Sequence, residues 1–99
     1  MAKLTEKSTS GTSFHFTTIR TTVNKLSNVL GEAQCIDNTG DDKVNFEWDC
    51  ETEEGDVFTI YDWKEYRSLH GEELIDFHIG GDNKIVTEKA KRELLDLLR

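Results

Sequence analysis

The sequence contains no long hydrophobic run, and no stretch approaches the roughly 20 apolar residues that a membrane-spanning helix requires. Its first residues, Met1 to Gly11, are polar and lack the apolar segment of a secretory signal peptide. Both absences argue against export and against a membrane location. We therefore expect a cytoplasmic protein that does not bind membranes.

Cysteine is scarce as well, with only Cys35 and Cys50 in the chain. Two thiols in a chain without an export signal are expected to be free rather than bridged. Cys50 alternates with polar residues, as a small core residue of a strand does, whereas Cys35 falls in a predicted loop.

The patterns of the common catalytic and metal sites are also missing. The three histidines show no metal-ligand spacing, and there is no CxxC or HExxH motif. Neither a glycine-rich phosphate loop nor a nucleophile elbow is present. We therefore predict no catalytic residues, no metal, no cofactor and no enzymatic activity.

Basic residues are outnumbered, since 12 Lys and Arg face 20 Asp and Glu, for a formal net charge of −8. Phosphate backbones bind cationic surfaces, so direct DNA binding is not expected. An acidic surface can meet a basic partner surface, or it can simply keep the protein soluble.

Ninety-nine residues suffice for one domain with one hydrophobic core. The Ser-, Thr- and Lys-rich residues 1–12 predict a flexible N-terminal arm, and residues 13–99 a single α+β domain. One-sided helical spacing of apolar residues predicts a first helix over Thr18–Leu30.

The rest of the domain alternates between apolar and polar residues in three segments. This alternation predicts strands at Val44–Thr52, Asp56–Trp63 and Leu74–Ile79. Gly80 and Gly81 are predicted to turn the chain into a last helix, Asn83–Leu98.

The loop formed by residues 53–55 (Glu-Glu-Gly) fixes the register of the first two strands. A three-residue hairpin loop with glycine in the left-handed position sets Cys50 opposite Phe58 and Trp48 opposite Ile60. The apolar residues of the strands then share one face, which we expect both helices to cover. The predicted fold is a three-stranded antiparallel β-meander with an N-terminal and a C-terminal helix on one face, in the order α-β-β-β-α.

The same register places an unusual set of residues on the opposite, outer face of the sheet. Aromatic rings and an imidazole lie there among carboxylates, in a set formed by Glu47, Asp49, Tyr61, Trp63, Asp76 and His78. A solvated face does not usually carry such aromatic residues, so we interpret the outer face as a contact surface for a partner or ligand. The alternatives are that the N-terminal arm or a helix covers it, or that it joins two copies into a homodimer.

A second candidate site lies at the end of the second strand. Lys64 and Arg67 could clamp an anion while Trp63 or Tyr66 stacks on a base, which would suit a nucleotide. The plainer interpretation is a strand end with surface ion pairs. Asp62 falls on the core side, where a carboxylate needs a hydrogen-bonding partner because an unpaired buried charge is costly.

Three motifs carry a resemblance to known proteins: NTGDDKVNFEW at 38–48, GDVFTIYDWKEYR at 55–67 and FHIGG at 77–81. Through them, residues 18–98 resemble a group of small proteins encoded by tailed bacteriophages. The group usually has a glycine near the position of Phe16, where this chain departs from it. The resemblance implies a phage origin and no particular mechanism.

These observations together lead to the hypothesis of a non-enzymatic, phage-encoded binding protein in the host cytoplasm. It would inhibit or sequester a host component, such as a defence protein, with Glu47, Asp49 and Asp76 meeting a basic surface. The first alternative is a nucleotide binder that acts as a homodimer, and the second is a small enzyme without a recognisable motif.

Overall fold

The three central strands of the sheet are those that the sequence predicts. They are β4 (Phe46–Glu51), β5 (Val57–Tyr61) and β6 (Ile75–Gly81), and each pairs antiparallel with the next. The computed structural model describes all residues from 1 to 99 and also contains the helices α1 (Val23–Leu30) and α2 (Lys84–Leu97). The α+β class is therefore confirmed, with the predicted meander at the centre of a larger sheet.

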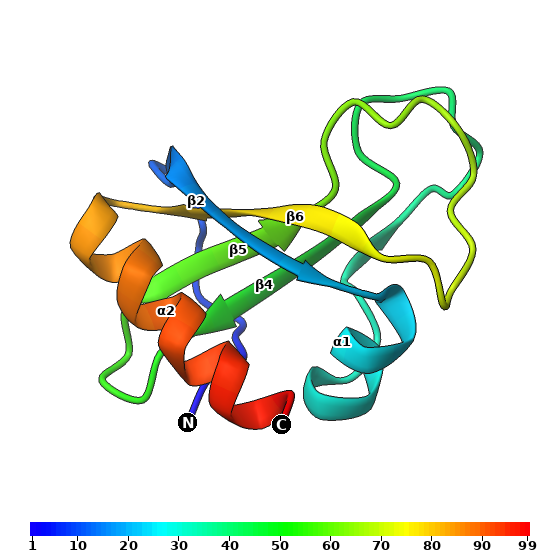
Figure 1. Cartoon of the computed structure of the whole chain (residues 1–99). Helices are drawn as coiled ribbons and strands as arrows, with labels where there is room; N and C mark the ends of the chain where they lie inside the picture. The colour runs from blue at the N-terminus through cyan, green and yellow to red at the C-terminus, as the bar shows by residue number, and fades with distance from the viewer.

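Three further strands extend the meander on both sides. They are β1 (Lys3–Leu4), β2 (Ser13–Thr21) and β3 (Cys35–Ile36), and they complete a six-stranded sheet with the order β1-β4-β5-β6-β2. The short strand β3 also pairs with β4, on the same edge as β1. Figure 1 shows β2 crossing in front of the central strands beside β6. All pairings are antiparallel.

The predicted helix Thr18–Leu30 is wrong in its first part, because the chain is a strand up to Thr21. Residues 17–23 are mostly β-branched, which favours a strand, and pairing with β6 stabilises it there. Thr22 then caps α1, since its side chain accepts a hydrogen bond from the backbone N–H of Lys25 at 3.1 Å. The element order is therefore β-β-α-β-β-β-β-α instead of α-β-β-β-α.

The predicted turn at Gly80 and Gly81 is also wrong, because both residues belong to β6 and are buried. A Cβ atom at Gly80 would lie 2.6 Å from Oγ1 of Thr59, and one at Gly81 would lie 2.9 Å from Cγ2 of Thr87. These glycines therefore allow close packing of neighbouring elements rather than a reversal of the chain. The following helix is as predicted, and Asn83 caps it by accepting from the backbone N–H of Val86 at 2.9 Å.

The first twelve residues, predicted as a flexible arm, contribute β1 and then connect opposite edges of the sheet. Because β1 lies at one edge and β2 at the other, residues 5–12 must cross the sheet, and we call them the crossing segment. In Figure 1 this dark blue chain passes behind the central strands. Thr5 donates its backbone N–H to the Asp49 carbonyl at 3.0 Å, and Lys7 donates to the Gly55 carbonyl at 3.2 Å.

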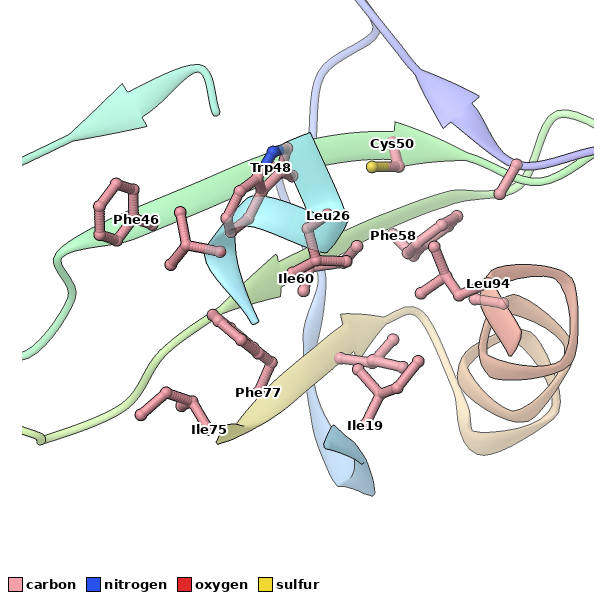
Figure 2. Packing of buried hydrophobic residues seen from close by; sticks show 14 of the residues in the cluster. Ile19, Leu26, Phe46, Trp48, Cys50, Phe58, Ile60, Ile75, Phe77 and Leu94 are labelled. Atoms are coloured by element: carbon pink, nitrogen blue, oxygen red, sulfur yellow. The ribbon is translucent and has the colours of Figure 1, made fainter. Parts of the chain in front are cut away.

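The core occupies one face of the sheet, as the sequence predicts. The pairs Cys50–Phe58 and Trp48–Ile60 are those expected from the hairpin loop. Figure 2 shows the side chains of both helices, Leu26 from α1 and Leu94 from α2, directed toward the core residues of the strands. Neither helix is both long and apolar enough to cross a membrane. Because both helices pack on the core face, the crossing segment runs over the outer face.

Candidate functional site

Aromatic side chains from three strands meet on the outer face of the sheet. The imidazole of His78 (β6) stacks on Phe14 (β2), with ring centroids 4.0 Å apart and planes inclined by 17°. On its other side, His78 lies 5.5 Å from Tyr61 and 6.2 Å from Trp63. Burial lowers the pKa of His78 below its ordinary value, which favours the neutral imidazole. With Phe16, these four residues form what we call the aromatic row.

Phe16 is the exposed end of the aromatic row. Its side chain is 85% exposed, and its ring lies 5.3 Å from that of Phe14. Its φ of 64° is in the left-handed region, which is unfavourable for a bulky residue. A bulge causes this conformation, because residues 15–17 of β2 lie opposite the single residue Ile79 of β6.

Hydrogen bonds of the residues before and after Phe16, His15 and Thr17, hold the bulge in place. His15 bonds through Nε2 to the carbonyl of Gly81 at 3.0 Å, and Lys84 donates from Nζ to the His15 carbonyl at 3.1 Å. The hydroxyl groups of Thr17 and Thr87 share a hydrogen bond of 2.8 Å. A strained backbone held by several contacts is common at functional sites, which makes Phe16 a candidate contact residue.

A pocket of about 260 Å³ lies beside the aromatic row. The crossing segment, β4, β5 and β6 all contribute to its walls, which consist of Thr9, Thr12, Ser13, Val44, Glu47, Thr59, Tyr61, Trp63 and Gly80. Five of these side chains carry a hydroxyl group and two carry an aromatic ring. Glu47 is the only lining residue with a carboxyl group, and no lining residue is basic. The predicted residues Glu47, Tyr61 and Trp63 are thus brought together.

Three acidic side chains follow one another along the outer face of β4. Glu51 is paired with the Lys7 ammonium at 2.7 Å, but neither Glu47 nor Asp49 has a basic partner. Oδ1 of Asp49 is buried, and the carboxyl group next to it is that of Glu47. Burial, followed by a hydrogen bond with the Asp49 side chain and by its negative charge, raises the pKa of Glu47 to about 7. The pocket therefore contains a carboxyl group that titrates near neutrality.

The predicted anion clamp does not assemble around one point. Lys64 places Nζ 5.6 Å from the ring centroid of Trp63, so these two residues are neighbours. Arg67 instead pairs with Glu73, at 2.7 Å between Nη1 and Oε1. Tyr66 is 55% exposed and does not line the pocket. The cluster is therefore divided, and its arginine is already bound to a carboxylate.

Asp76 and Asp62 have other roles. Asp76 pairs with Arg20 of β2 at 3.1 Å and lies outside the pocket. Asp62 is fully buried and accepts hydrogen bonds from the backbone N–H groups of Asn45 at 2.9 Å and Phe46 at 2.8 Å. The Asp62 carboxylate thus takes the place of a backbone carbonyl as the acceptor for these two N–H groups. Its role is therefore structural.

The sequence reasoning missed Phe14, Phe16 and the two threonines of the crossing segment, Thr9 and Thr12. A signal for the two phenylalanines was present, since Phe14 and Phe16 alternate with polar residues at the start of a run rich in threonine. The neighbouring residues do not show which strand these phenylalanines pair with, or on which face of the sheet their rings lie. The threonines come from a segment without periodicity, and only the crossing places them beside Tyr61.

Comparison with known proteins found no match, either to a family model or to a curated protein or solved structure. No group of three or more His, Cys, Asp or Glu side chains is placed to hold a metal ion. Interpretation of the site therefore depends on its own geometry: an aromatic row with an exposed end, and a polar pocket with an unpaired acid.

Proposed function

We propose that this chain is a non-enzymatic binding protein whose contact surface is the outer face of the sheet. Its partner would be a protein with a basic surface. The observation that carries the proposal is the aromatic row, which crosses three strands and ends in a phenyl ring that is 85% exposed. Aromatic side chains in the middle of a polar surface are typical anchors of protein interfaces.

The charge of the molecule favours a basic partner. The chain carries a formal net charge of −8, and two acids of β4 have no basic partner: Glu47, which lies opposite Tyr61, and its neighbour Asp49. Oppositely charged surfaces accelerate association and select against unsuitable partners. Sequestration of a nucleotide is less well supported, because Arg67 is bound to Glu73 and no basic residue lines the pocket.

The resemblance to small phage-encoded proteins adds a biological setting to this proposal. A phage protein of this kind would meet its partner in the host cytoplasm and inhibit or sequester it by occupying the partner's basic surface. This setting rests on the resemblance of the motifs alone, whereas the contact surface rests on the aromatic row.

Capture experiments with two matched variants test the contact surface. Phe16→Ala removes the exposed end of the aromatic row, and Ile85→Ala removes a side chain of similar exposure (80%) from α2. We expect a host protein to be retained by the original chain and by Ile85→Ala, to be lost with Phe16→Ala, and to elute with salt. Equal retention of that protein by both variants would contradict the proposal.

A further inference from the structure

We infer that the pocket beside the aromatic row binds a primary alkylammonium group, such as the end of a lysine side chain or of a small polyamine. The inference deepens the proposed function and rests on it, because the pocket lies within the same outer face. Its geometry comes from the crossing segment, which passes over the sheet and leaves a space of about 260 Å³ between Thr9, Thr12 and the ring of Trp63.

None of the residues that line the pocket is basic. Of the three acids along the outer face of β4, only Glu51 has lysine partners, namely Lys7 at 2.7 Å and Lys3 at 3.6 Å. Glu47 lines the pocket, and the side chain of Asp49 lies next to Glu47 on the same face of β4, within hydrogen-bonding reach of it. Both side chains are half-buried and neither has a basic partner, so an entering ammonium group would supply a counter-charge to ionised Glu47.

The remaining walls suit an ammonium group with an aliphatic stem. Oxygen atoms of the lining hydroxyl groups can accept its hydrogen bonds, and those of Thr9, Thr59 and Tyr61 make no hydrogen bond within the protein. The ring of Trp63 already lies near two ammonium groups, from Lys43 at 5.8 Å and Lys64 at 5.6 Å. An aromatic face attracts cations, and neither of these two lysines belongs to the lining of the pocket. Anionic ligands find no basic lining residue.

Binding of a cation by this pocket should depend on pH through Glu47. The groups that face Glu47 are Asp49 on its own strand, Tyr61 opposite it in β5 and Cys35 opposite it in β3. The crossing segment adds only hydroxyl groups to the pocket. Because burial and Asp49 raise the pKa of Glu47 to about 7, its carboxyl group is largely protonated at pH 6 and ionised at pH 8. The ammonium group binds the ionised form.

The test is calorimetric titration of the full chain at constant ionic strength with three probes. N-acetyl-lysine methylamide represents a partner's side chain, its Nε-acetylated form is the neutral control, and 1,4-diaminobutane represents a free polyamine. We expect the two amines to bind and the acetylated form not to bind. Affinity should rise about tenfold between pH 6 and pH 8, as the ionised fraction of a group with a pKa near 7 does.

Two variants separate a local effect from a change in overall charge. Glu47→Gln removes the carboxylate of the pocket, whereas Glu32→Gln makes the same charge change at an exposed residue without an ion pair. We expect Glu47→Gln to lower amine affinity at pH 8 at least tenfold and to abolish the pH dependence, and Glu32→Gln to do neither. The pH series on the unmodified chain decides the question even if a variant unfolds.

The outcomes have distinct meanings. Stronger binding of the lysine derivative assigns the pocket to a partner's side chain, and stronger binding of the diamine assigns it to a free polyamine. Equal binding of the acetylated form, or no binding of either amine, overturns the inference. If the amines fail while Phe16→Ala still abolishes partner capture, the contact surface stands and only the assignment of the pocket is wrong.

Discussion

His78 stacks on Phe14 across two strands, with ring centroids 4.0 Å apart, although the residues are far apart in the sequence. The contact joins β2 to the outer face and determines the environment of the imidazole. It also makes the aromatic row continuous, because His78 is the ring that contacts Phe14 on one side and Tyr61 and Trp63 on the other.

Replacing Phe14 should therefore change both stability and titration. In Phe14→Ala, loss of a partly buried ring and of its stacking partner should lower the free energy of unfolding by about 1–3 kcal/mol. The pKa of His78, lowered by burial, should rise toward its ordinary value, and the imidazole NMR signals measured against pH would show this. Phe16→Ala is the control, and it should leave the pKa of His78 nearly unchanged. An unaltered pKa in Phe14→Ala would mean that this ring does not shield His78.

The left-handed backbone of Phe16 can be tested with two substitutions that remove the same ring. Glycine accepts a φ of 64° without strain, whereas alanine retains the clash of its Cβ atom. We expect the free energy of unfolding of Phe16→Gly to be about 1 kcal/mol higher than that of Phe16→Ala. Urea denaturation of both variants measures this difference. The reverse order would show that residue 16 leaves the left-handed region when its ring is absent.

Asp62 should be important for stability and not for binding. Its buried carboxylate accepts hydrogen bonds from two backbone N–H groups, those of Asn45 and Phe46. Asp62→Ala leaves both donors unsatisfied and should cost about 2–5 kcal/mol in the free energy of unfolding. Asp76→Ala is a suitable control, because its exposed pair with Arg20 should contribute less than about 1 kcal/mol. Similar losses in the two variants would contradict this distinction.

Ionisation of Glu47 should lower the free energy of unfolding as the pH rises. The folded state raises its pKa from 4.5 to about 7, so between these values the folded chain binds more protons than the unfolded chain. Stability contributed by the protonated form is complete below pH 4.5 and is lost as the pH rises through 7. Because the side chain is partly solvated, we expect the loss to be about 1–2 kcal/mol, less than the full shift would give.

Comparison with Glu47→Gln isolates this effect. The variant cannot ionise at residue 47, so it should match the original chain near pH 4.5 and become the more stable of the two above pH 7. Thermal unfolding of both proteins across this pH range provides the measurement. A constant difference at all pH values would show that Glu47 titrates normally in the folded state.

The sequence by itself determined the central hairpin and the division of its residues between two faces. The loop at residues 53–55 and the alternation of apolar residues act between neighbours in the chain, so the pairs Cys50–Phe58 and Trp48–Ile60 follow from local rules. Glu47, Tyr61, Trp63 and His78 were placed on the outer face for the same reason.

Only the tertiary structure decided what lies beside these residues. The spacing of Ile19 and Val23 suits a helix, yet pairing with β6 keeps Ile19 in a strand and brings Phe14 onto His78. The crossing segment has no periodic pattern, and its position follows from pairing β1 and β2 with opposite edges of the sheet. Such contacts between distant segments depend on the free energy of the whole fold, and for that reason the pocket could not be derived from local sequence.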